Sequence, residues 1–185
     1  MQNYKKSIKQ IYDRAIKEQN FVYSSYDRYL NDEARKMYNS DFLQKYIDER
    51  QSKLDKINQD AAININKTLE EYMAKLGPNK EVIDSLEYQT KLNNLLTMLQ
   101  LQNIKIDTKI DTSMFDFITE ARDTKTMKLI QNAFHNSYLN VYVQENSVEI
   151  EEAMAKQLAD GAKRAIAGGT DYNSQVAIYQ MENIE

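Results

Sequence analysis

The chain has 185 residues, of which 42% are hydrophobic and 28% are charged, and it carries a formal net charge of −4 at pH 7. Four glycines and one proline are too few for an all-β fold, which needs frequent turns, so the composition predicts long helices joined by few breaks. The absence of cysteine excludes disulfides, thiolate nucleophiles and Cys-ligated zinc.

The first expected helical segment runs from about Tyr4 to Tyr38. Apolar residues recur in it at the three- and four-residue steps of a helix, and Ser24-Ser25 interrupts the pattern. The segment is therefore expected to form two helices or one bent helix, with the break between about Phe21 and Ser25.

The clearest expected element is a long amphipathic helix from about Asp41 to Leu76. Its apolar positions step by three and four residues and form a seam along one face. At about 1.5 Å per residue this helix is on the order of 50 Å long, which exceeds the ~30 Å that a small domain spans. It therefore needs a partner helix, either in a second copy of the chain or in residues 4–38 of the same chain. The expected seam residues are Leu43, Ile47, Leu54, Ile57, Leu69 and Tyr72.

Gly77-Pro78 is expected to end the long helix, because glycine accepts the left-handed cap and proline cannot continue the hydrogen-bond ladder. Asn79 is then a cap for the next helix. The apolar face that follows, between Val82 and Leu99, is the best candidate for a hydrophobic core. Further helices are expected to begin near Asp123 and Ser147.

A tandem repeat, Lys-Ile-Asp-Thr, occupies residues 105–112. Its isoleucines share one parity, which is typical of a short strand or an extended linker. A single strand would have no pairing partner in a chain with this composition, so the extended linker is the preferred interpretation.

These elements together predict an all-α fold. Residues 1–76 are expected to form a long coiled-coil-like helical hairpin. Residues 79–169 are expected to form a compact small helical bundle, and residues 170–185 a short amphipathic tail.

No catalytic, cofactor-binding or metal-binding motif is visible in the sequence, so we expect a protein that is not an enzyme and needs no cofactor. His135 is the only histidine and, without cysteine, it cannot build a multi-histidine or Cys–His site. Glu149, Glu151 and Glu152 lie in the first turn of an expected helix, where the helix dipole favours negative charge.

The start of the chain is basic and offers an alternative function. Lys5, Lys6 and Lys9 lie on one expected helix, with Tyr4 and Tyr12 nearby. Lysines of this kind contact phosphates, and tyrosines stack on bases. Against nucleic-acid binding, the patch is small, the whole chain is acidic, and no recognition-helix motif is present.

The expected compartment is the cytoplasm, which is that of the host cell if the chain is viral. The lysines at the N-terminus are not followed by an apolar run of the kind found in secretory signals. No stretch approaches the ~18 apolar residues that a membrane span requires, so no membrane partner is expected.

A Lys/Glu-rich coiled segment, then Gly77-Pro78, then a compact Leu-rich helical part resembles the small helical proteins encoded by phages of low-GC Gram-positive bacteria. The chain is similar in style to phage scaffolding and assembly proteins. The resemblance implies an acidic, helical, oligomeric protein whose charged ends contact the coat. Residues 144–185 provide an acidic end, because their three basic and eight acidic side chains give a charge of −5. The resemblance concerns the general composition and order of segments in the chain, and it assigns no residue a role.

The leading hypothesis is therefore a non-enzymatic, scaffold-like assembly protein that forms homo-oligomers through the seam and binds a second protein such as a viral coat protein. One alternative is a phage-encoded inhibitor that binds a host defence or nucleoprotein complex. The other alternative is the nucleic-acid binder described above.

Overall fold

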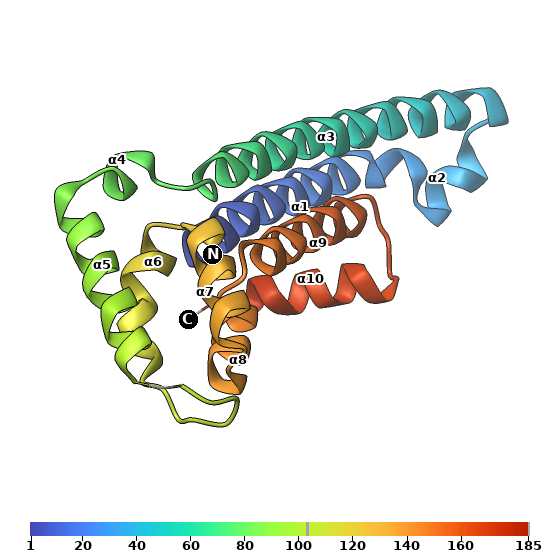
Figure 1. Ribbon diagram of the computed structural model, residues 1–185. Coiled ribbons are helices and arrows are strands. Elements are labelled where there is room, and N and C mark those ends of the chain that lie inside the picture. The colour runs from blue at the N-terminus through green and yellow to red at the C-terminus, as the bar shows by residue number, and fades with distance from the viewer. Residues whose placement is uncertain (103, 185) are drawn as a thin grey trace. The chain divides into compact units, whose positions relative to one another are not determined.

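The computed structural model describes residues 1–102 and 104–184, and its regular elements there are helices without any strand, which confirms the predicted all-α class (Figure 1). The α-helices are α1 (Gln2–Leu30), α2 (Asp32–Met37), α3 (Ser40–Lys75), α4 (Lys80–Ile83), α5 (Leu86–Leu101), α6 (Asp116–Glu120), α7 (Thr124–Phe134), α8 (Ser137–Glu145), α9 (Val148–Ile166) and α10 (Tyr172–Glu182). A short 3-10 helix, η1 (Thr112–Phe115), precedes α6.

The chain divides into two compact units. Unit 1 joins Met1–Tyr72 with the chain from Ala155 onward, and unit 2 is Met73–Met154. This grouping differs from the expected domains at 79–169 and 170–185, because most of α9 and all of α10 belong with the N-terminal helices. The last residue of the expected tail, Glu185, lies outside the described part of the chain. The reason for the grouping is that α9 buries a face of small and aliphatic residues against the N-terminal helices, which no local signal in its own sequence specifies.

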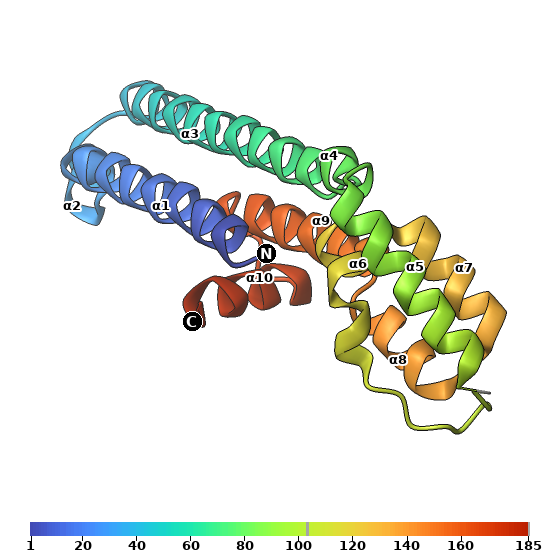
Figure 2. The same ribbon diagram turned by 60° about the vertical axis from the view of Figure 1, so that its left-hand side comes forward.

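The predicted helical hairpin is confirmed in unit 1, where α1 and α3 lie side by side and run in opposite directions (Figures 1 and 2). Near its open end the ring of Tyr4 stacks on that of Tyr72, with the ring centroids 4.5 Å apart. Near the turn Tyr29 stacks on Tyr46 at 4.2 Å. These pairs fix the register of the two long helices at both ends.

The predicted break near Ser24-Ser25 is wrong, because α1 continues without interruption to Leu30. Both serine hydroxyls donate to the backbone carbonyl four residues earlier, so they are satisfied inside the helix. The chain breaks instead at Asn31, whose side chain accepts a hydrogen bond from the amide of Ala34 and caps α2.

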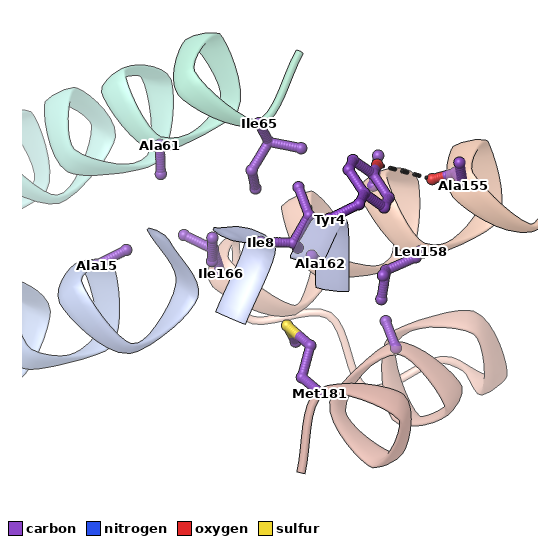
Figure 3. Packing of buried hydrophobic residues seen from close by; sticks show 12 residues of the cluster. Tyr4, Ile8, Ala15, Ala61, Ile65, Ala155, Leu158, Ala162, Ile166 and Met181 are labelled. Atoms are coloured by element: carbon purple, nitrogen blue, oxygen red, sulfur yellow. Dashed lines mark hydrogen bonds between the residues drawn. The ribbon is translucent and has the colours of Figure 1, made fainter. Parts of the chain in front are cut away.

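The core of unit 1 is formed by α1, α3, α9 and α10, as Figure 3 shows. Helix α9 contributes Leu158 and the alanines Ala155, Ala159 and Ala162, whose small side chains let the neighbouring helices approach closely. The hydroxyl of Tyr4 is buried in this core and donates to the carbonyl of Ala155 at 2.9 Å. Burial raises the pKa of Tyr4, with a further contribution from the charge of Asp160.

Unit 2 has its own core, which confirms the compact helical bundle that follows the hairpin. Its buried residues are Leu95, Leu99, Ile110, Phe115, Ile118, Met127, Ile130 and Leu139. The expected core face of α5 is only partly correct. Leu95 and Leu99 are buried in this core, but Leu86, the first residue of α5, is 83% exposed.

The Lys-Ile-Asp-Thr repeat of unit 2 is neither strand nor helix up to Asp111, as expected for the preferred interpretation. It is also anchored, because the fully buried side chain of Asn136 donates to the carbonyls of Lys105 and Thr108. The amide of Ser137 donates to the carbonyl of Ile106 at 2.8 Å. The segment is thus a loop held against the start of α8.

No helix within the described residues has the length and apolar character needed to cross a membrane.

Candidate interaction surface

The six expected seam residues all pack inside unit 1. Leu54 is buried in a cluster with Val22, Tyr26 and Leu30 of α1. The others are partly buried against this cluster or against the core of unit 1: Leu43, Ile47, Ile57, Leu69 and Tyr72. The structure thus shows the pairing within one chain that the sequence left open, and a role of the seam in oligomerisation stays a prediction.

One side of the hairpin is hollowed where α1 and α3 face each other. The hollow nearer the turn has a volume of about 610 Å³ and is lined by Arg14, Lys17, Glu18, Phe21, Val22, Lys53, Lys56 and Ile57. A second hollow of about 610 Å³ follows toward the open end and shares Arg14, Glu18 and Ile57 with the first. Its further lining residues are Ile11, Ala15, Asp60, Ala61, Ile63, Asn64, Lys67, Thr68 and Glu71. We call the two together the hairpin groove.

The helical repeat explains why these side chains line one groove. On α1 the lining positions follow one another by three or four residues, from Ile11 through Arg14 and Glu18 to Phe21, and so they share a face. The core side chains Tyr4 and Ile8 adjoin Ile11 and Ala15 at the same helical spacing, and all four contribute to the core that α1 and α3 share with α9 and α10. Among the described residues, those that line the two hollows belong to α1 and α3.

Phe21 is the most unusual member of the groove, because its side chain is 74% exposed. Its neighbour Val22 is buried and belongs to the floor, together with the half-buried Ile57. A large aromatic ring at the rim of an apolar floor loses solvent contact only when another molecule covers it. The sequence interpretation missed Phe21 because it placed a helix break there.

The end of the groove nearer the turn is basic. Arg14 pairs with Glu18, with 3.0 Å between Nε and Oε1. The Nζ atom of Lys53 lies 4.9 Å from the centroid of the Tyr26 ring, and a hydrogen bond with the Tyr26 hydroxyl raises the pKa of Lys53. Among the described residues Lys17 and Lys56 have no ion-pair partner. This end therefore presents uncompensated positive charge beside an apolar floor.

The lysines of the proposed nucleic-acid contact lie on the first turns of α1. Lys9 forms an ion pair with Asp13 at 2.7 Å, while Lys6 is exposed and Lys5 half-buried. Tyr4 is buried in the core of unit 1, so its ring cannot stack on a base while unit 1 is folded. Nucleic-acid binding then depends on the lysines and the half-buried Tyr12.

His135 ends α7 in the left-handed conformation, with a φ angle of 46°, and its amide donates to the carbonyl of Gln131. This is a C-terminal cap of the helix. No group of three or more histidine or acidic side chains is arranged for a metal ion within the part of the chain that the structure describes.

Glu149 makes a specific contact beyond the expected interaction with the helix dipole. Its carboxylate pairs with Lys128 and accepts a hydrogen bond from the hydroxyl of Ser147. The hydrogen bond from Lys128 is the largest cause that lowers the pKa of Glu149 to about 2. The contact holds the start of α9 against α7 within unit 2.

This pair predicts a small acid sensitivity. A carboxyl whose pKa is depressed on folding stabilises the protein above its unfolded pKa of about 4.3, and this contribution disappears as the pH falls toward about 2. More than half of each side chain is exposed, so the effect should stay below about 1 kcal/mol. Urea unfolding should show Glu149→Gln less stable than the parent chain at pH 6 and equal to it at pH 2. Glu145→Gln is the control, and equal losses in both variants would contradict the assignment.

No family model, curated protein or solved structure matches the chain.

Proposed function

We propose that this chain is a non-enzymatic helical assembly protein, scaffold-like in character, that self-associates and binds another protein such as a viral coat or host protein. The observation that carries the proposal is the end of the hairpin groove nearer the turn, where Val22 and Ile57 form an apolar floor and the exposed ring of Phe21 lies at the rim. An amphipathic helix laid into such a groove is a common form of protein recognition.

Large apolar side chains elsewhere on the surface support the binding of a further partner. In unit 2 the exposed fraction of Leu101 is 81%, that of Ile106 is 68% and that of Leu129 is 61%. Single exposed apolar residues are ordinary. Several large ones, on a chain in which only 42% of the residues are hydrophobic, add to the apolar surface that association can cover. These residues belong to unit 2, whereas the groove is lined by residues of unit 1.

Self-association predicts a mass above that of one 21.7 kDa chain, and the mass should rise with protein concentration. Sedimentation velocity over a hundredfold range of concentration measures it. Circular dichroism at the lowest concentration should show the same helicity, because each unit has its own core. A strict monomer at the highest concentration would overturn the proposed self-association.

A further inference from the structure

We propose that a small cavity in unit 2 binds a carboxylate group through the guanidinium of Arg122. The carboxylate belongs to a small carboxylic acid or to an acidic side chain of another protein, because both present the same group. The cavity is bordered by α6, α7, α8 and the start of α9, all within unit 2. The proposal therefore does not depend on the self-association proposed above.

The backbone at Arg122 is the first observation. Arg122 follows α6 in the left-handed conformation, with a φ angle of 56°. Its amide donates to the carbonyl of Thr119, and the amide of Asp123 donates to the carbonyl of Ile118, both at 3.0 Å. This is the Schellman arrangement, which usually has glycine at the left-handed position because a side chain there is strained. An arginine at this position lowers the local stability, so its side chain calls for another explanation.

The guanidinium of Arg122 has no partner in the described part of the chain. Its side chain forms neither a hydrogen bond nor an ion pair there, and its Nη1 atom is buried. By contrast, Arg50, which also has a buried unpaired nitrogen, lies over the ring of Tyr23. A buried polar atom without an acceptor is costly and points to a water, an ion or a ligand. Because Arg122 lines the cavity, a group placed there can supply the acceptor.

The two acids that line the cavity do not neutralise Arg122. Both carboxylate oxygens of Asp123 accept hydrogen bonds from other groups, Oδ1 from the amide of Thr126 at 3.0 Å and Oδ2 from the hydroxyl of Tyr88 at 2.8 Å. The carboxylate of Glu149 is held by the contacts described above. The guanidinium thus keeps its charge for a group from outside the chain.

The charge around the cavity favours a ligand with one negative charge. The lining contains two basic and two acidic side chains, Arg122, Lys128, Asp123 and Glu149. These cancel formally, but the cavity also borders the first residues of α7 and α9. The N-terminus of a helix acts as about half a positive charge, so the two ends together contribute roughly one. A monoanion balances this charge, whereas a phosphate dianion would be repelled by the two acids.

The size and lining of the cavity indicate a carboxylate. The cavity has a volume of about 40 Å³, which is room for about three water-sized groups, and a carboxylate has three non-hydrogen atoms. Its walls include the apolar side chains of Ile118, Met127 and Val143, which suit the methylene next to a carboxylate. Lys128 and Glu149 are more than half exposed, so the cavity reaches the surface. A planar carboxylate can accept two parallel hydrogen bonds from an arginine.

Sodium propionate is the probe for this site. The ¹H–¹⁵N NMR spectrum of the full chain is followed while propionate replaces chloride at constant ionic strength. We expect saturable shifts of the Nε–H group of Arg122 and of the amides of Thr124 and Val148, which border the cavity. Propionamide, which has the same shape without the charge, should bind at least about tenfold more weakly. Equal binding of propionamide, or no saturation by propionate, would overturn the proposal.

Two variants separate a specific site from general attraction to positive charge. Arg122→Lys keeps the charge and a long side chain but lacks the planar fork, so it should bind propionate at least about tenfold more weakly than the parent chain. The matched control is Lys125→Gln, which removes an exposed positive charge at the start of α7 outside the cavity lining. It should bind like the parent, and equal weakening in both variants would contradict the assignment.

The stability of the chain without propionate gives a second test. Arg122→Gly relieves the left-handed conformation and removes the buried guanidinium, so its thermal midpoint should rise by about 2 °C or more while propionate no longer binds. His135→Gly is the matched control, because it relieves a left-handed residue that does not line the cavity and should leave propionate binding unchanged. A lower midpoint for Arg122→Gly would show that the guanidinium stabilises the fold through its own contacts, and would overturn the proposal.

Peptides distinguish the two sources of the carboxylate. A capped Gly-Glu-Gly tripeptide that competes with propionate would assign the cavity to an acidic side chain of a protein, with Gly-Gln-Gly as the control. Failure of the tripeptide to compete would assign it to a free small acid, and either result supports the carboxylate site. Inorganic phosphate that binds more tightly than propionate would contradict the argument from charge and size, and would overturn the carboxylate assignment.

Discussion

Asn136→Asp is expected to be among the most destabilising single substitutions in unit 2. The Asn136 side chain is fully buried, and its amide group donates to the carbonyls of Lys105 and Thr108 at 2.8 Å each. Its oxygen accepts from the amides of Tyr138 and Leu139 and caps α8. Aspartate retains the cap but loses both donors, and it turns a buried negative charge toward two carbonyl oxygens. We expect a loss of about 3 kcal/mol or more at pH 7.

Urea unfolding followed by circular dichroism measures this loss, and hydrogen exchange should show faster exchange in residues 105–108. Burial raises the pKa of the introduced carboxyl, and a protonated carboxyl regains one donor, so the destabilisation should be smaller at pH 4 than at pH 7. Asn136→Ala removes the cap as well and should show no such pH dependence. Ser137→Ala is the matched control, because Ser137 donates to the loop through its backbone amide, which alanine retains. Unchanged stability of Asn136→Asp at pH 7 would show that the loop has another anchor.

Gly161→Ala is expected to destabilise unit 1, although alanine is favoured over glycine inside a helix by about 1 kcal/mol. A Cβ atom at this position of α9 would lie 2.5 Å from the carbonyl oxygen of Asn173 and 2.6 Å from Cβ of Ala177, both in α10. Neither atom belongs to a flexible side chain, so α10 must move away. Overpacking of this kind costs about 1–3 kcal/mol, which outweighs the helical preference.

The sign of the effect is the test. Thermal unfolding should give a lower midpoint for Gly161→Ala than for the parent chain. Hydrogen exchange should be faster than in the parent chain in α10 and unchanged in α5 of unit 2. Gly161→Val should be more severe. Gly77→Ala is the matched control, because a Cβ atom there meets only the carbonyl of Ala74, at 3.8 Å, and the φ angle is ordinary. Stabilisation by Gly161→Ala would mean that α10 does not pack closely on α9.

Local signals in the sequence were sufficient to locate most of the helices. The side chain of Asn79 accepts from the amide of Val82, and that of Asp123 from the amide of Thr126, and both were expected to begin helices. These caps act over three residues, and the apolar repeat of α3 acts over three or four, so their effects follow from neighbouring residues. Ser24-Ser25 misled the same approach because a serine hydroxyl is equally satisfied inside a helix.

The candidate surface could be predicted only in part. The seam of α3 was visible in the sequence, and its residues do pair, but with α1 of the same chain. Phe21, Lys17 and Lys56 were not recognised, because a residue becomes part of a groove only when a second helix takes its place beside it. Their positions on the faces of α1 and α3 were readable, yet nothing local shows which face α9 covers and which stays open.

The sequence by itself determined that this protein is built of helices, where most of them begin, and that α3 is long and amphipathic. Only the tertiary structure decided that α9 and α10 join the N-terminal hairpin, that Gly161 allows their close contact, and that Asn136 holds a loop more than twenty-five residues away in the chain. The physical reason is range: hydrogen bonds and side-chain spacing within a helix connect residues up to four apart, whereas packing between helices depends on shapes that form only after the whole chain has folded.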